Sequence, residues 1–430
     1  MLRPPRRGPA RPPARLRLFR SLALVVLLVV MAATATACSE EAGPITDGNV
    51  AGPTDTVVAA GTEDEPSGEA DPEPPIDRVA QVMATMTAEQ KIGQLLMPMV
   101  FGTGDDVTPA ERRLNLEAHG YATPSEIVSR YQLGGVIYLQ SNIDSAPQVK
   151  SFSRRLQQAA ADSSGIGLLV AIDQEGGRVS RLSDEVSLFP PALDLAGDPR
   201  LVQESAYVTG QQVQQQGINV VLAPVADVVE VASPSFIGNR SYGEDPEAVA
   251  TMVSAAVAGL QQSGVAAAVK HWPGHGATSV DSHSSLPTVD VDRETWESRE
   301  RVPFAAAVEQ DVSIVLVGHL AMPKLDPSAQ PATISPILVD DLLRNGLGFD
   351  GVVMSDALNM GAVGDIPSGE LEVGSILAGV DIVLIPPSLS DAYAALTAAV
   401  ADGRISEQRL DASVARVLRL KENLGLLPIR

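Results

Sequence analysis

From residue 76 onward, short runs of apolar residues recur along the chain. The runs are continuously apolar and do not alternate with polar residues, which is typical of strands that are covered on both faces, as in a parallel sheet. Eight such runs lie at residues 93–100, 133–139, 167–172, 220–223, 265–269, 312–317, 351–354 and 381–385. We therefore expect eight buried strands.

Segments with helical spacing lie between these runs. One of them carries Ala248, Met252, Ala255, Ala256 and Leu260, and the last carries Leu410, Val414, Val417 and Leu418 before Gly425. Thr87 and Gln90 have the form of a capping box at the head of a helix that leads into the first run. Eight alternations of strand and helix predict an α/β fold, with residues 76–430 forming one (β/α)8 TIM-type barrel domain. A doubly wound open sheet is the alternative architecture.

Residues 1–37 form a separate segment with the composition of an export signal. They contain seven arginines and no acidic residue, followed by an apolar stretch at 22–33 and small residues. That stretch is shorter than the roughly 20 residues needed to span a bilayer. We therefore expect a signal peptide and an exported protein.

Cys38 is the only cysteine of the chain, so no internal disulfide can form. A lone cysteine after such a signal resembles the lipid-attachment site of bacterial lipoproteins, although the usual leucine is missing from Ala35-Thr36-Ala37. The same three residues also fit ordinary signal cleavage. We expect lipid attachment at Cys38, which would anchor the protein to the cell membrane facing outward, and secretion is the alternative.

Residues 38–75 predict a disordered acidic tether between the signal and the domain. Residues 39–75 contain no lysine or arginine and almost no large apolar residue, so the segment cannot bury enough surface to fold. Removing the seven signal arginines from 31 basic residues leaves 24 against 53 acidic ones, and the formal charge changes from −22 to −29. This charge argues against nucleic acid as a partner.

The stretch KHWPGHGATSVDSH, residues 270–283, places three histidines, a lysine and an aspartate where a strand should give way to a loop. His271 and His275 have the spacing of zinc ligands on a helix, but the intervening proline and glycine break a helix and no glutamate lies between them. We expect no metal. Asp281 and His283 are two residues apart, so an extended or turning segment can bring them together as a general acid/base dyad. The alternative is a solvated loop whose polar residues have no catalytic role.

Further polar residues follow the other apolar runs. In a barrel these positions would share the rim at the carboxyl ends of the strands, where barrel enzymes carry out their chemistry. They are Asp173, Asp227, Arg240, Lys270, His271, His319 and Asp356. So many polar residues at one rim indicate a site, and no single one of them would.

Four of these segments carry a family resemblance: AIDQEGGRVSRL, IGNRSYGEDP, VKHWPGHGATSVDSHSSLP and GVVMSDALNM. In this order and spacing the chain resembles the bacterial β-N-acetylhexosaminidases of glycoside hydrolase family 3, in their single-domain form. The resemblance implies that Asp356 is the nucleophile, that His283 is the acid/base and that Asp281 holds His283. It also implies that the terminal sugar is bound by Asp173, Arg181, Arg240, Lys270 and His271. Trp272 stands where relatives often have Phe or Ile.

The resemblance implies a retaining exo-β-N-acetylglucosaminidase that removes terminal N-acetylglucosamine from peptidoglycan fragments without a cofactor. The residues agree with double displacement, in which a carboxylate forms a glycosyl ester and an imidazole moves the proton. Because an imidazole does not repel anions as a carboxylate base does, phosphorolysis is an alternative outcome. A non-catalytic sugar-binding lipoprotein and a Schiff-base aldolase using Lys270 are further alternatives, although the rim aspartates would keep that lysine charged.

Overall fold

The computed structural model describes residues 77–183, 186–230 and 235–428. The chain divides into two units, Met1–Glu73 and Pro74–Arg430, and all described residues belong to the second. The expected signal, lipid-attachment site and tether therefore lie outside the described residues and stay predictions. No helix among the described residues is long and apolar enough to cross a membrane.

Eight buried strands lie at the eight apolar runs. They are β1 (Leu96–Met97), β2 (Gly135–Tyr138), β3 (Leu169–Ile172), β6 (Val220–Val221), β7 (Ala266–Trp272), β8 (Ile314–Val317), β9 (Val352–Ser355) and β10 (Val383–Leu384). Most strands are shorter than their runs, and two of the differences have a local cause. The helix before β1 includes Gly93 and Gln94, because its Thr87–Gln90 capping box starts a helix of seven residues. Strand β7 runs on through Lys270 and His271 to Trp272, and this whole stretch is buried.

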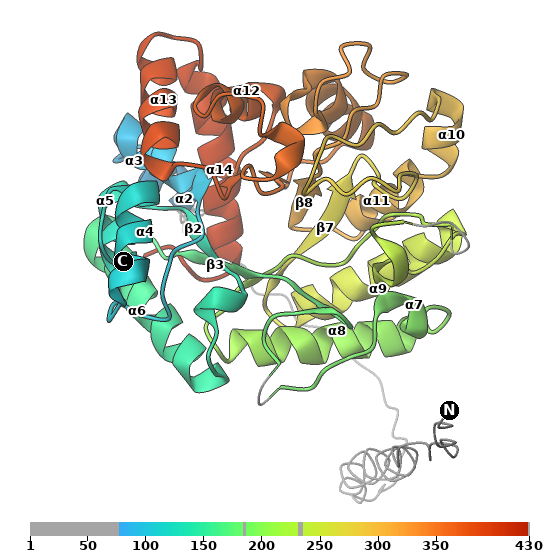
Figure 1. The fold of residues 1–430 in the computed structure, drawn as a ribbon, viewed down its shortest axis with the longest axis horizontal. Helices are drawn as coiled ribbons and strands as arrows, with labels where there is room; N and C mark the ends of the chain where they lie inside the picture. Colours follow the sequence, from blue (N-terminus) through green and yellow to red (C-terminus); the bar gives the residue numbers. More distant parts are fainter. Residues whose placement is uncertain (1–76, 184–185, 231–234, 429–430) are drawn as a thin grey trace, which may run out of the picture. The chain divides into compact units, whose positions relative to one another are not determined.

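The strands pair in parallel. Six of them form one sheet in the order β2-β3-β6-β7-β8-β9, and β1 pairs with β10. Single parallel bridges, Met99 with Ile137 and Met354 with Ile382, connect this pair to both edge strands of the sheet. The result is a TIM-like α/β fold in which the strands lie inside and the helices outside (Figure 1). The order excludes the open doubly wound sheet, whose strand sequence reverses at its centre.

Helices follow the strands and cover their outer faces (Figure 1). The main ones are α4 (Pro109–His119), α5 (Pro124–Tyr131), α6 (Ala146–Ser164), α8 (Pro199–Gln214), α9 (Pro246–Gln262), α11 (Arg301–Glu309), the π-helical segment Ile337–Asn345, α12 (Glu370–Ala378), α13 (Leu389–Ala401) and α14 (Glu407–Asn423). Shorter ones are α2 (Arg78–Met83), α3 (Ala88–Gln94), α7 (Ala192–Leu195) and α10 (Arg293–Ser298). Several begin with a polar N-cap residue followed by proline, whose missing N–H costs nothing in the first turn.

The expected helical stripes are present, except that Ala248 is exposed and Ala255 is only half-buried. In α14 the four apolar residues named above are all buried. In α9, Met252, Ala256 and Leu260 are buried, but Ala248 is exposed and Val249 is buried in its place. The inner face of α9 therefore begins one residue later than expected, since Val249, Met252 and Ala256 keep the i, i+3, i+7 spacing.

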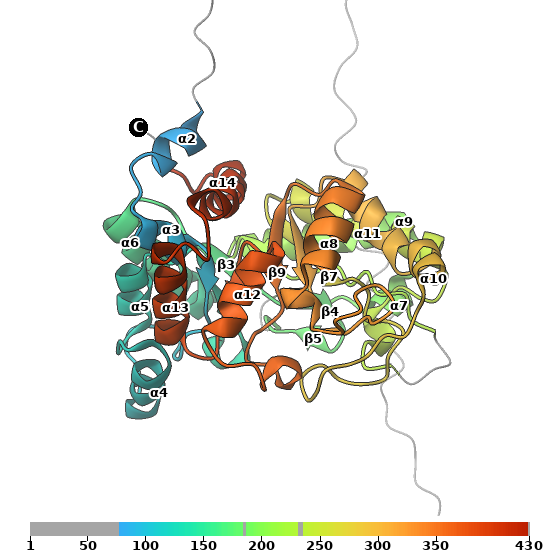
Figure 2. The ribbon, with the colours of Figure 1, turned by 90° about the horizontal axis from the view of Figure 1, so that it is seen from above.

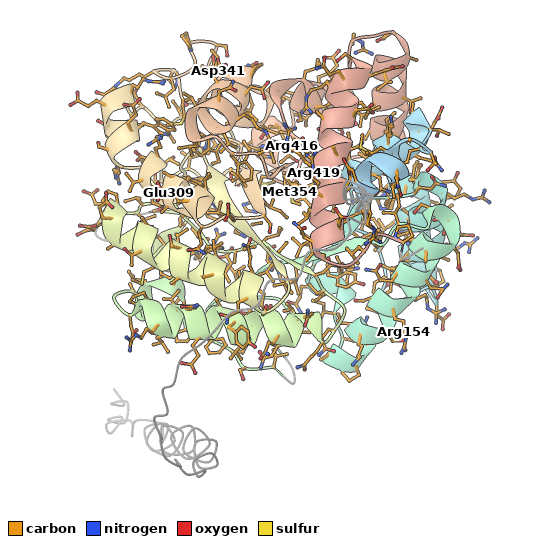
Figure 3. The ribbon with its side chains drawn as sticks, turned by 180° about the vertical axis from the view of Figure 1, so that it is seen from behind. Arg154, Glu309, Asp341, Met354, Arg416 and Arg419 are labelled. Carbon is orange, nitrogen blue, oxygen red and sulfur yellow. The ribbon has the colours of Figure 1, made fainter. Side chains whose placement is uncertain are left out.

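The two ends of the strands carry different structures. At the carboxyl ends, β3 is followed by the hairpin β4 (Gln174–Gly176) and β5 (Val179–Ser180), and long segments follow β6 and β7. In Figure 2, α2 and α14 lie at the end opposite this hairpin. Figure 3 shows α14 from behind, with Arg416 and Arg419 on it.

Buried polar groups join the elements at the amino ends of the strands. The carboxylate of Asp381 accepts hydrogen bonds from the Val353 N–H (2.9 Å) and the Ser413 hydroxyl (2.5 Å), and it pairs with Arg344 and Arg416. On α14, Lys421 is wholly buried, and its Nζ donates to Oε1 of Gln94 at 2.6 Å. Burial lowers the pKa of Lys421 to about 7. The Asp381 interactions thus tie α14 to β9, and the Lys421 bond ties α14 to the helix that precedes β1.

Candidate active site

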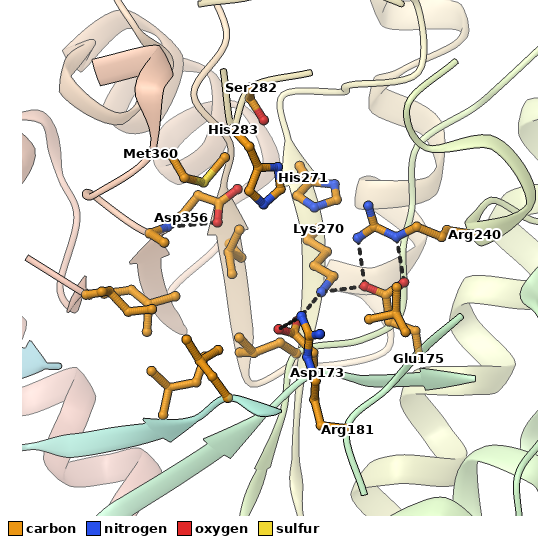
Figure 4. Close-up of a pocket in the computed structure, with 18 of the residues that line it drawn as sticks. Asp173, Glu175, Arg181, Arg240, Lys270, His271, Ser282, His283, Asp356 and Met360 are labelled. Atoms are coloured by element: carbon orange, nitrogen blue, oxygen red, sulfur yellow. Dashed lines mark hydrogen bonds and ion pairs between the residues drawn. The ribbon is translucent and has the colours of Figure 1, made fainter. Parts of the chain in front are cut away.

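A cavity of about 390 Å³ opens at the carboxyl ends of the strands (Figure 4). Seven of the eight side chains predicted to act or bind line it: Asp173, Arg181, Arg240, Lys270, His271, His283 and Asp356. The eighth, Asp281, does not line the cavity but is hydrogen-bonded to His283. Residues that are 183 positions apart in the chain thus meet in one place, because parallel strands bring their carboxyl ends to the same rim.

Asp356 directly follows β9 and faces the cavity. Its N–H donates to the Val317 carbonyl at 2.8 Å, and its Oδ1 accepts the Ala357 N–H at 2.8 Å. Burial alone would raise the pKa of Asp356, but the nearby His319 and His271, the Ala357 N–H and Lys270 outweigh burial and lower it. The carboxylate is therefore ionised at neutral pH, as a nucleophile must be.

His319 follows β8 and is completely buried. Its Nε2 donates to the Ala357 carbonyl at 3.0 Å, and its Nδ1 lies 2.6 Å from Oγ1 of Thr333. Burial lowers the pKa of His319, although the nearby Asp356 carboxylate opposes this shift. His319, expected at the rim, thus fixes the residue that follows Asp356.

Asp281 and His283 form the expected pair in a tight turn. Oδ1 of Asp281 accepts both the His283 N–H (2.9 Å) and the His283 Nδ1–H (2.8 Å). Partial burial opposes ionisation of Asp281, but these two donors outweigh it and lower the pKa of that carboxyl. Because Nδ1 is engaged, Nε2 is the ring nitrogen available to a reacting group. The His283 side chain is 62% exposed, and its ring contacts Phe236 edge-on at 5.3 Å between centroids.

The floor of the cavity is a set of paired charges. Nζ of Lys270 lies 2.9 Å from Oδ1 of Asp173 and 2.7 Å from Oε1 of Glu175. Arg240 holds Glu175 with two bonds of 2.7 Å, and Arg181 lies 3.5 Å from Asp173. Burial would lower the pKa of Lys270, but Asp173 and Glu175 outweigh burial and raise it. The amine is therefore an ammonium ion, which argues against the Schiff-base alternative.

Comparison with known proteins identifies the family of this chain. Residues 87–420 match the glycosyl hydrolase family 3 N-terminal domain. The chain belongs to glycosyl hydrolase family 3. The family expected from the sequence is thereby confirmed.

Curated relatives of this family 3 chain include two β-hexosaminidases. The chain is 32% identical over 371 residues to "Beta-hexosaminidase A" of Pseudoalteromonas piscicida, which covers 79% of this chain and 62% of that protein. It is 34% identical over 317 residues to "Beta-hexosaminidase LpqI" of Mycobacterium tuberculosis, with 70% and 78% covered. The chain thus spans less than two thirds of the P. piscicida protein.

Solved structures give the same likeness. A family 3 β-N-acetylglucosaminidase from Paenibacillus sp. superposes with a TM-score of 0.73 at 39% identity, covering 79% of this chain and 63% of that one. The structure of M. tuberculosis LpqI superposes with a TM-score of 0.69 at 31% identity, covering 80% of this chain and 96% of that one.

Two acidic residues of this family 3 site were not among the predicted site residues. Glu175 lies two positions after Asp173, so an extended hairpin aims both side chains the same way. Burial opposes ionisation of Glu175, but Lys270 and Arg240 lower its pKa to about 2. Asp227 was expected at the rim without a role. It is fully buried, and its carboxylate binds Nδ1 of His271 at 2.7 Å, which leaves Nε2 of that ring toward the cavity.

His275 has a structural place beside this network. Its N–H donates to Oδ1 of Asp227 at 2.6 Å, and its Nε2 lies 3.1 Å from Oγ of Ser282. Burial lowers the pKa of His275, and His271 lowers it further, so the ring is neutral. Within the described part of the chain, no three side chains of His, Cys, Asp or Glu are arranged to hold a metal ion.

Proposed function

We propose that this family 3 chain is a retaining exo-β-N-acetylglucosaminidase. The observation that carries the proposal is the presence of the Asp356 carboxylate and the Asp281–His283 pair at a single cavity with a floor of hydrogen-bonding ions. Relatives named as β-hexosaminidases and β-N-acetylglucosaminidase support the choice of sugar.

We also propose that the eight strands close completely into a (β/α)8 barrel, through the two bridges beside β1 and β10.

The proposed reaction has two displacements. A carboxylate oxygen of Asp356 attacks the anomeric carbon, the glycosidic C–O bond breaks, and Nε2 of His283 gives its proton to the departing oxygen. Water then attacks the anomeric carbon of the glycosyl ester while His283 takes a proton from it, and the Asp356 carboxylate is released. Two inversions retain the β configuration.

The paired ions of the floor would recognise the terminal sugar. Lys270, Arg240 and Arg181 are donors, and Asp173 is an acceptor that is partly open to the cavity. A sugar has many hydroxyl groups, and a site built to bond them rejects molecules that lack them, because its buried polar groups would then stay unpaired. The floor therefore favours a saccharide over an apolar ligand.

The acceptor in the second step is a separate question. An imidazole carries no negative charge, so it does not repel an anion that approaches the glycosyl ester. Phosphate could therefore replace water, and the product would be a sugar 1-phosphate. We place water first because the named relatives are hexosaminidases.

The proposed setting follows from the N-terminal segment. An export signal at 1–37, lipid attachment at Cys38 and an acidic tether at 38–75 would place the enzyme outside the cytoplasmic membrane. Peptidoglycan fragments with N-acetylglucosamine β-linked to N-acetylmuramic acid are the proposed substrates there.

One experiment tests these points together. The protein is incubated with a disaccharide of N-acetylglucosamine and N-acetylmuramic acid, first without and then with phosphate, and the products are identified by mass spectrometry. Free N-acetylglucosamine in both samples supports hydrolysis, and a sugar phosphate in the second supports phosphorolysis. An intact disaccharide together with an intact nitrophenyl N-acetylglucosaminide would reject the enzyme and favour a sugar-binding protein.

A further inference from the structure

The acid/base turn, residues 281–285, exposes the side chain on which the chemistry depends. His283 is 62% exposed at its side chain, and Ser284 and Ser285 are exposed as well. Inside the turn, the Ser284 N–H donates to the Asp281 carbonyl at 3.0 Å. These bonds lie within the turn, so they determine its shape but not its position relative to the cavity. Its position must therefore be set by contacts with other segments.

The strongest of these contacts come from the segment that follows the nucleophile. The Gly361 N–H donates to the His283 carbonyl at 3.0 Å, and the Ala362 N–H donates to the Ser282 carbonyl at 3.1 Å. Gly361 opens a short 3₁₀ helix, Gly361–Val363, only five residues after Asp356. One short segment therefore carries the nucleophile at its start and holds the acid/base turn at its end.

Gly361 allows this approach because it has no side chain. A Cβ at this position would lie 2.7 Å from the Ser284 carbonyl oxygen and 2.8 Å from the His283 carbonyl oxygen. Both neighbours are backbone atoms, which cannot turn aside as the end of a side chain can. The backbone angles of Gly361 are ordinary, since it is not among the glycines with positive φ. The requirement is therefore for space and not for a special conformation.

A second contact holds the turn from the other side. Oγ of Ser282 lies 3.1 Å from Nε2 of His275, which is itself buried and tied to Asp227. This contact connects the turn to the segment after β7, and β7 itself carries Lys270 and His271, which line the cavity. Ser282 and His283 are thus held between the two sides of the cavity.

We propose that Gly361 is a positioning residue for His283. It sets the distance between the acid/base turn and the nucleophile segment, so that Nε2 of His283 reaches the departing oxygen. The inference deepens the proposed glycosidase function and rests on it. A shift of about 1 Å at a reacting group can cost about 100-fold in rate, and a Cβ at Gly361 would impose a shift of that order.

The test compares Gly361→Ala with Gly364→Ala. Gly364 lies one turn further on, and a Cβ there would meet its nearest atom at 3.6 Å, an ordinary contact. Turnover is measured on the unactivated disaccharide, which needs a proton on its leaving group, and on a nitrophenyl glycoside, which does not. For Gly361→Ala we expect a fall in kcat/KM of about 100-fold on the disaccharide and less than about 10-fold on the nitrophenyl glycoside. Gly364→Ala should stay near wild type on both.

A second variant and a second measurement keep the inference testable. Ser282→Ala removes the bond to His275 without adding bulk. It should also lower kcat/KM more on the disaccharide than on the nitrophenyl glycoside, but by a smaller factor than Gly361→Ala. Hydrogen exchange of the Ala362 amide should be at least about 10-fold faster in Gly361→Ala than in Gly364→Ala, because that amide loses the Ser282 carbonyl.

The outcomes separate this inference from the proposed function. Equal losses on the two substrates, or unchanged exchange at Ala362, would overturn the role of Gly361 even in an active glycosidase. A wild-type protein without activity on either substrate would overturn the proposed function, and the exchange measurement would still decide whether Gly361 holds the turn.

Discussion

Replacing Lys421 by methionine should change how the stability of the protein depends on pH. Lys421 is completely buried, and Gln94, a neutral amide, is its hydrogen-bond partner. Burial lowers its pKa from 10.5 to about 7. The unfolded chain therefore binds one more proton than the folded chain between these two values. The free energy of unfolding must rise with pH across this window, and the contribution is lost as pH falls to 7 and below.

The magnitude follows from the size of the shift. One pKa unit corresponds to about 1.36 kcal/mol, so the two pH units from 7 to 9 give wild type a gain of at most about 2.7 kcal/mol, reduced somewhat because the folded Lys421 is already half deprotonated at pH 7. Methionine has a similar length and does not titrate, so Lys421→Met should lack this gain. The variant also leaves the Gln94 oxygen unpaired, at a cost of about 1–3 kcal/mol that does not change with pH. Only the difference between the two pH values is therefore informative.

Urea unfolding at pH 7 and pH 9 measures this difference. Trp272 and Trp296 are the two tryptophans of the chain and both are buried, so their fluorescence reports unfolding of the domain. Lys150→Met, at an exposed position of α6, is the control and should follow wild type. If Lys421→Met and wild type gain the same stability between pH 7 and pH 9, the argument from burial is wrong.

Three further predictions concern the site and the N-terminal segment. Asp356→Ala should lower kcat by several orders of magnitude with little loss of stability, and a slow fluorinated substrate should label the Asp356 peptide of wild type; a label on another carboxylate would contradict the assignment. His283→Ala should impair cleavage of the disaccharide far more than cleavage of a nitrophenyl glycoside, and Asp281→Ala should show a smaller difference in the same direction. Equal losses of activity on the two substrates would make His283 a binding residue. Cys38→Ala should move the protein from the detergent phase to the aqueous phase, whereas an unchanged distribution would speak against a lipid anchor.

The sequence predicted the strands well because their signal is strong and local. A continuous apolar run between turn residues allows few other structures, and all eight runs contain strand residues. The bounds were less accurate where two signals compete. The capping box at Thr87 extends a helix into the first apolar run, and β7 continues past its apolar residues because Lys270 and His271 are buried by their ion partners.

The site was predictable where reacting groups follow strands, and not where partners are brought in by folding. Asp356 and Lys270 stand at strand ends and were found. The buried bond from Asp227 to His271 spans 44 residues, and nothing in the local sequence indicates it. The need for Gly361 was hidden for the same reason, since a glycine after a strand commonly serves only a turn.

The paired ions at the floor of the cavity determine how strongly sugar binding would depend on the salt concentration. Lys270, Arg240, Asp173 and Glu175 neutralise one another over distances below 3 Å, far shorter than the roughly 8 Å Debye length at physiological salt. Dissolved ions screen such close, buried pairs very little, and the pairs project little field into the solvent. Binding of the uncharged terminal N-acetylglucosamine by these paired ions would therefore depend little on the salt concentration. Such indifference to salt would suit the proposed exported form of the enzyme, since a cell does not control the ionic strength outside it.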